Sequence, residues 1–305
     1  MKKILVPVDF SKVSESATHF AVDLAKAKNA SVLLLNSSRV NYVSEHPYEA
    51  LSMAQQVVNQ VIESAEQRMS HLAGTLDKAV KVETKVSFLG ILDAVKEETE
   101  FNDIDLIVMG TTGCSGWEEV LIGSNTERIV RSVKCPVISV PIGAGTRINK
   151  IMIPLDLMEI RRSFLNEVSN LQQLFDCELE FLWVKTPHNI ENEEVVSTQL
   201  EKLFNEYGIG NYKLKIVKNI FPADGILEEA EASGSDMIAM ATHARRGISH
   251  WLSGSLTEDT VNHVHVPVWT FKINKDEDII KINEVERAKA EVKELGRHGH
   301  LILTA

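Results

Sequence analysis

Cysteine is scarce in this chain, with three residues among 305: Cys114, Cys135 and Cys177. Their odd number and wide spacing exclude a disulfide framework and a zinc site built on cysteines. Long apolar runs are also absent, since none approaches the roughly 18–20 residues that a membrane-spanning helix needs. The first residues enter an apolar strand pattern directly, without a cleavable signal pattern. We therefore expect a protein of the reducing cytoplasm with no membrane partner.

An excess of positive charge is missing too. The formal net charge is −11, which argues against nucleic acid as a partner. The chain lacks a Walker Gly-Lys-Ser/Thr motif, a nucleophile elbow and paired catalytic carboxylates. We interpret the pair His263 and His265, at a helix end, as structural, and the pair His298 and His300 has no third ligand near it in the sequence. These absences favour a binding protein over an enzyme, and we predict no metal site.

What the chain does contain is an internal duplication. Lys3–Asp9 resembles Lys150–Asp156 at an offset of 147 residues, whereas Asp105–Met109 resembles Asp236–Met240 at an offset of 131. The second copy is therefore shorter, and the deletion lies between the first helix and the fourth strand. Two collinear copies of this length predict tandem domains rather than a solenoid. We place the domains at residues 1–146 and 147–273, followed by a charged linker, a short helix and a tail at 274–305.

Each copy alternates apolar strand patterns with amphipathic helix patterns. The strand runs are almost continuously apolar, which is typical of parallel strands covered on both faces. This alternation predicts an α/β fold of two tandem doubly wound parallel sheets, each with five strands in the order 3-2-1-4-5. We expect first-copy strands near 3–8, 31–36, 81–87, 104–109 and 136–140, with helices near 13–28, 48–73, 90–100 and 124–133. The second-copy strands are expected near 149–154, 178–184, 212–218, 236–241 and 267–271.

The most informative motif is Gly110-x2-Gly113-x9-Gly123-Ser124, which follows an apolar strand and leads into a helix. Glycines at a strand end let a phosphate or ribose approach the backbone, and a helix start supplies free N–H groups. Ser124 and Glu127 also form a capping box, so part of the motif is explained by helix capping. The two earlier glycines are not needed for capping. The motif therefore predicts a nucleotide cradle.

Asp9 is expected at the same cradle. In a sheet of this order, ligands bind beyond the carboxyl ends of the first and fourth strands. Asp9 ends the first strand, and Gly110 and Gly113 follow the fourth. The aspartate is a candidate helix cap together with Ser11, or a hydrogen-bonding group for adenine or ribose.

Four sequence segments together resemble the universal stress protein family: Val6–Ser11, Met109–Gly113, Gly123–Ile129 and Cys135–Val137. The resemblance covers both copies but not the C-terminal tail. It implies the adenine nucleotide alpha hydrolase-like fold, and a pairing of the fifth strands, Pro136–Val140 and Pro267–Phe271, that makes an internal pseudo-dimer. Family members with this glycine pattern bind ATP, and Mg²⁺ can accompany the triphosphate.

The resemblance also implies roles for individual residues. Asp9 and the backbone of Val8 would meet the adenine or ribose, and Met109 belongs to the same motif. Ribose and phosphates would lie along Gly110, Thr112 and Gly113. The phosphates would meet backbone and hydroxyl groups of Gly123, Ser124, Asn125 and Thr126.

The second copy departs from the motif. Ala241 and Ala244 stand where the first copy has Gly110 and Gly113. Where a left-handed backbone is required, alanine costs roughly 1–2 kcal/mol, and a methyl group obstructs a phosphate in any case. His243, Arg245 and Arg246 are candidates for partial compensation, or for solvated surface charge. We expect one competent site, in the first copy.

The resulting functional prediction is an ATP-binding, nucleotide-dependent regulator or sensor in the stress response, acting on an unidentified protein partner. Two alternatives stay open. One is slow ATP hydrolysis or self-phosphorylation with Ser124 as an acceptor, and the other is a structural scaffold without nucleotide. A further homodimer is also left open.

Overall fold

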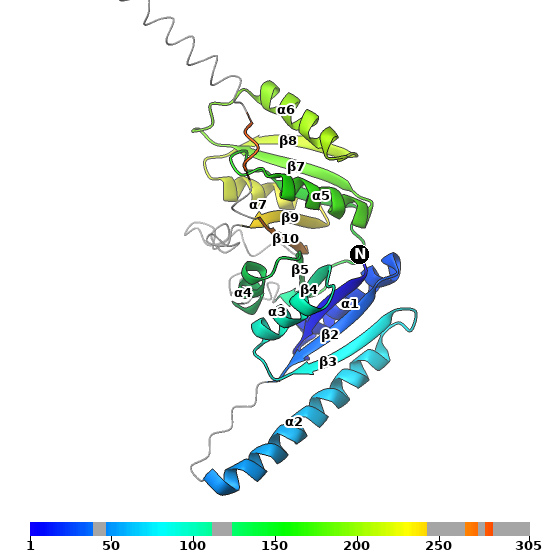
Figure 1. Ribbon diagram of the computed structural model, residues 1–305. Coiled ribbons are helices and arrows are strands. Elements are labelled where there is room, and N and C mark those ends of the chain that lie inside the picture. The colour runs from blue at the N-terminus through cyan, green and yellow to red at the C-terminus, as the bar shows by residue number, and fades with distance from the viewer. Residues whose placement is uncertain (39–46, 112–123, 243–265, 274–277, 283–305) are drawn as a thin grey trace, which may run out of the picture.

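The computed structural model describes the chain except for residues 39–46, 112–123, 243–265, 274–277 and 283–305. Its ten strands form one continuous sheet in the order β3-β2-β1-β4-β5-β10-β9-β6-β7-β8 (Figure 1). Strands β1–β5, the first half, and β6–β10, the second half, each show the predicted order 3-2-1-4-5 with parallel neighbours. The predicted fold class is confirmed.

Strands and helices alternate along each half. The elements of the first half are β1 (Lys3–Val8), α1 (Lys12–Lys28), β2 (Ser31–Ser37), α2 (Pro47–Thr75), β3 (Lys81–Ser87), α3 (Ile91–Phe101), β4 (Leu106–Thr111), α4 (Ser124–Ser132) and β5 (Val137–Pro141). Those of the second half are β6 (Lys150–Pro154), α5 (Arg162–Phe175), β7 (Glu178–Lys185), α6 (Glu193–Glu206), β8 (Tyr212–Lys218), α7 (Pro222–Ala232), β9 (Met237–Thr242) and β10 (Val268–Lys272). The helix expected around 284–295 lies outside the described residues.

The central strands are buried because their apolar runs are covered on both faces. In β1, every residue from Ile4 to Val8 is buried. Helix α1 buries the apolar stripe Ala17, Phe20, Ala21 and Leu24 against the sheet, as its 3.6-residue spacing predicts. None of the described helices has the length and apolarity required to cross a bilayer.

The deletion in the second copy falls on the helix after the second strand. Helix α2 has 29 residues, whereas its counterpart α6 has 14. Figure 1 shows α2 as the longest helix, at the β3 edge of the sheet. The shorter α6 confirms that the missing residues come from this crossover.

The two halves are joined by β5 and β10, which pair antiparallel through Val268 with Ser139, Trp269 with Ile138 and Thr270 with Val137. The Thr270 hydroxyl donates to the carbonyl oxygen of Val137 at 3.1 Å. Trp269 is 2% exposed and stacks near Phe271. The predicted pairing of the fifth strands is confirmed. Because the pairing is antiparallel, the carboxyl edges of the two halves face opposite ways.

Replacing Trp269 with alanine tests how far this seam holds the protein together. Removing a fully buried tryptophan is expected to cost about 3–5 kcal/mol of unfolding free energy, measured by urea denaturation. Ile190→Ala is the control, because Ile190 is 90% exposed and its loss should change stability by less than about 0.5 kcal/mol. Equal losses of unfolding free energy in the two variants would show that Trp269 at the seam contributes no more to stability than an exposed side chain.

Candidate functional site

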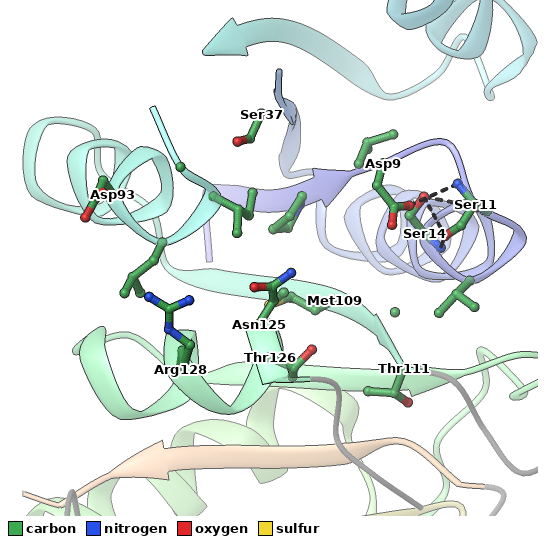
Figure 2. Close-up of a pocket in the computed structure, with 17 residues that line it drawn as sticks. Asp9, Ser11, Ser14, Ser37, Asp93, Met109, Thr111, Asn125, Thr126 and Arg128 are labelled. Carbon is green, nitrogen blue, oxygen red and sulfur yellow. Dashed lines mark hydrogen bonds between the residues drawn. The ribbon is translucent and has the colours of Figure 1, made fainter. Parts of the chain in front are cut away.

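A cleft of about 620 Å³ opens at the carboxyl edge of the first half. It lies where β1 and β4 are neighbours, which is the point where strand order reverses and ligands bind in doubly wound sheets. Its walls come from the ends of β1, β2 and β4 and from the starts of α1, α3 and α4 (Figure 2). The lining residues are Pro7, Val8, Asp9, Ser11, Val13, Ser14, Ser37, Gly90, Ile91, Leu92, Asp93, Met109, Gly110, Thr111, Asn125, Thr126 and Arg128.

Six of the predicted site residues therefore line one cleft: Val8, Asp9, Met109, Gly110, Asn125 and Thr126. Thr112, Gly113 and Gly123 lie outside the described residues. Ser124 begins α4, but its side chain is also outside the described part of the chain. The structure thus brings segments a hundred residues apart to a single place, and the ligand-binding role of each residue stays a prediction.

Asp9 organises the turn that leads from β1 into α1. Its Oδ1 atom accepts a hydrogen bond from the Ser11 backbone N–H at 2.9 Å, and the Ser11 hydroxyl oxygen accepts from the Ser14 N–H at 3.2 Å as the helix cap. Ser11 is therefore the cap, and Asp9 supports the residue that caps (Figure 2). Burial tends to raise the pKa of Asp9, but hydrogen bonds from Ser11 and Ser14 outweigh it and hold the pKa below its ordinary value. The carboxylate is ionised at neutral pH.

The residue between them, Phe10, has a left-handed backbone with φ of 64°. A non-glycine residue there costs roughly 1–2 kcal/mol, and such strain is concentrated at functional sites. The Arg68 guanidinium of α2 lies 3.8 Å from the centre of the Phe10 ring, so a cation–π contact holds the turn. Nothing in the local sequence signals this conformation, because the contact comes from a distant helix.

Gly110 is required by packing. A Cβ atom at this position would lie 2.4 Å from the carbonyl oxygen of Val13, in the first turn of α1. The close crossing of α1 over β4 therefore explains this glycine without any ligand. The sequence interpretation, which assigned the glycine to ligand approach, gave a different reason for it.

The second half shows why alanine is tolerated at the corresponding Ala241. At the offset of 147, Lys12 of α1 corresponds to Glu159, but α5 begins only at Arg162. The first turn of α5 is thus displaced along the chain relative to that of α1. Helix α1 also packs closely on β4, whereas α5 does not approach β9 to the same extent, so Ala241 meets less crowding.

Helix α4 presents its amino-terminal end to the cleft. Asn125 and Arg128, three residues apart and hence on one helix face, are exposed and line the cleft, whereas Thr126 is only 3% exposed. Free N–H groups and the dipole at a helix start favour an anion. Sequence reasoning missed Arg128, although its spacing from Asn125 was a usable signal. It also missed Ser37 and Asp93.

The backbone of Val8 was predicted to contact the adenine or ribose, but one of its polar groups is already engaged within the protein. Its carbonyl oxygen already accepts a hydrogen bond from the buried Asn36 side-chain amide at 2.8 Å.

Among the described residues, no group of three or more His, Cys, Asp or Glu side chains lies close enough to hold a metal ion.

Comparison with known proteins identifies the family. The family model described as universal stress protein family matches residues 1–141 and again 147–272. A universal stress protein of Synechocystis sp. is 25% identical over 299 residues, covering 89% of this chain and all of the relative. Another, from Methanocaldococcus jannaschii, is 32% identical over 143 residues, covering 46% of this chain and 81% of the relative. The chain belongs to the universal stress protein family.

A solved structure agrees with the fold. The universal stress protein of Archaeoglobus fulgidus superposes with a TM-score of 0.63 at 17% identity, covering 88% of this chain and 98% of that one. At this identity, the likeness concerns the fold.

The packing role of Gly110 can be tested by Gly110→Ala. The added methyl group meets backbone, which has little freedom to move, so we expect a loss of about 1–3 kcal/mol in unfolding free energy, measured by urea denaturation. Gly145→Ala is the matched control, because no described atom lies within 4 Å of its added Cβ. If Gly110→Ala is as stable as Gly145→Ala, α1 does not fix this glycine.

Proposed function

We propose that this universal stress protein binds an adenine nucleotide, ATP, in the first-half cleft, and that occupancy of the cleft regulates a protein partner. The main support for this proposal is that the Asp9 turn, the end of β4 and the start of α4 converge on one cleft of about 620 Å³. Small-molecule sites are typically about 300–1,000 Å³ and combine apolar walls with a few placed polar groups.

The charges of the cleft suggest an orientation for the nucleotide. The ionised Asp9 repels phosphate, but accepts hydrogen bonds from ribose hydroxyls or an exocyclic amine. The start of α4 and Arg128 favour the phosphates instead. Apolar walls for the base are offered by Val8, Ile91 and Met109. The cleft thus has a carboxylate side and a phosphate side.

The regulatory part of the proposal is supported by the position of α4. This helix contacts β10 of the second half as well as lining the cleft. A nucleotide that shifts α4 would therefore favour one conformation of the β5–β10 seam over another. A protein partner that binds one of these conformations more tightly would respond to the change in their populations. We infer binding rather than catalysis as the primary activity, in the cytoplasm.

The second half is proposed to lack a site. Asp156 keeps the turn seen at Asp9, with its Oδ1 accepting from the Met158 N–H at 2.9 Å. The surrounding polar groups are gone, however, because Met158 corresponds to Ser11 and Val184 to Ser37. We therefore expect one nucleotide per chain.

Asp9→Asn tests the first-half site. Asparagine preserves the turn acceptor but loses the charge, and a hydrogen bond to a charged group contributes about 1.5–3 kcal/mol. Affinity for ATP, measured by calorimetry, should fall about tenfold to a hundredfold. The matched variant is Asp156→Asn, at the equivalent turn of the second half, which should bind as the parent does. Equal ATP affinity of the Asp9 variant and the parent would show that this carboxylate does not contribute to nucleotide binding.

The stoichiometry gives an independent test. Equilibrium dialysis with ATP should saturate at one nucleotide per chain. Two sites of equal affinity would contradict the assignment of the second half, and absence of saturable binding would favour a scaffold.

A further inference from the structure

A short segment after β10 crosses to the start of α5. This segment, residues 278–282, is called the strap, and it is the orange-red piece of ribbon in Figure 1. The strap pairs antiparallel with the chain before α5 through Ile279 and Arg161. The Ile280 N–H donates to the carbonyl oxygen of Ile160 at 2.8 Å. The contact is thus made backbone to backbone, at two adjacent positions.

The strap also contributes to the core. Ile280 and Ile282 pack against the same apolar cluster as Leu157 and Ile160, which are 7% and 1% exposed. From the loop between β6 and α5, Leu155, Leu157 and Ile160 belong to this cluster. Removing the strap would therefore uncover apolar surface and release a backbone acceptor.

Arg161 is enclosed at this place as well, being 6% exposed. Its Nη2 atom lies 3.1 Å from Glu159 Oε2. Burying a guanidinium costs free energy unless the group is paired and hydrogen-bonded. Glu159 supplies that partner, and the strap pairs with the backbone of the same residue, Arg161.

The corresponding place in the first half belongs to the cleft. At the offset of 147, Ile160 and Arg161 correspond to Val13 and Ser14, and both of these line the first-half cleft. In the second half, the same pair of positions is bound by the chain itself.

The capping of the first helix also differs between the two halves. Helix α1 is capped by the Ser11 side chain, whereas α5 has Arg161 at its N-cap position with no side-chain capping bond. The backbone before α5 is held by the strap.

From these contacts, we infer that the strap is a built-in occupant of the second half, which closes its carboxyl edge and fixes the start of α5. This inference does not depend on nucleotide binding in the first half. It assigns a function to residues beyond the second repeat.

Hydrogen exchange of the full chain tests the inference. Ile280→Pro removes the N–H that donates to Ile160. We expect peptides covering 155–166 to exchange about tenfold faster, since local opening follows the free energy of the lost contacts. Peptides covering the equivalent first-half residues 8–19 should be unchanged. The control is Ile279→Ala, because this side chain is 39% exposed and the variant keeps the backbone pairing.

Ile280→Ala is the second variant, for use if the proline variant does not fold, and it should give a smaller increase confined to the same peptides. Unchanged exchange at 155–166 in either folded variant would overturn the inference. So would an equal increase at 8–19, because it would indicate global destabilisation. ATP affinity should stay at the parent value, because no strap residue lines the first-half cleft. Loss of ATP binding in a folded strap variant would show that the strap also supports the first half, and would overturn its assignment to the second half.

Discussion

The antiparallel contact between β5 and β10 is the constraint on which the rest of the molecule depends. Each half ends its sheet with a strand that would otherwise be an edge, with unpaired backbone groups. Pairing those strands within one chain satisfies both edges, and Trp269 of β10 is buried in the apolar core at this seam. It also reverses the strand direction of the second half relative to the first. The two carboxyl edges are therefore separate environments, free to diverge.

Their divergence can be traced to where the first helix of each half begins. In the first half, Ser11 caps α1 directly after the Asp9 turn. The helix then passes so close to β4 that only glycine fits at position 110. In the second half the helix starts later, at Arg162, and the extended residues before it are available for backbone pairing. The early helix start thus accompanies the open cleft of the first half, and the later one accompanies the contact with the strap in the second.

Sequence patterns were sufficient for the architecture. The strands and the shortened crossover follow from apolar runs and the internal repeat, because burial on both faces of a parallel sheet leaves a strong local signal. The pairing of the fifth strands came from the family resemblance instead. The site was only partly predictable. Asp9 and Asn125 lie in the cleft as expected, but the reason for Gly110 and the strained backbone at Phe10 depend on α1 and α2. The strap was hidden in a segment interpreted as charged linker. Its apolar pair, Ile279 and Ile280, was the one available signal.

Strand β10 lies between the first-half cleft and the rest of the second half. Helix α4 lines the cleft and contacts β10. Ile273, the residue after β10, is 3% exposed and belongs to the main apolar core. A displacement of α4 would act on this seam strand, which it contacts directly. Coupling between distant sites requires an element that both sites bias, and β10, which contacts α4 and pairs with β5, is placed to transmit a change at the cleft to the seam. Its Thr270 hydroxyl, which bonds across the seam to Val137, limits how far the strand can slide without breaking the joint sheet.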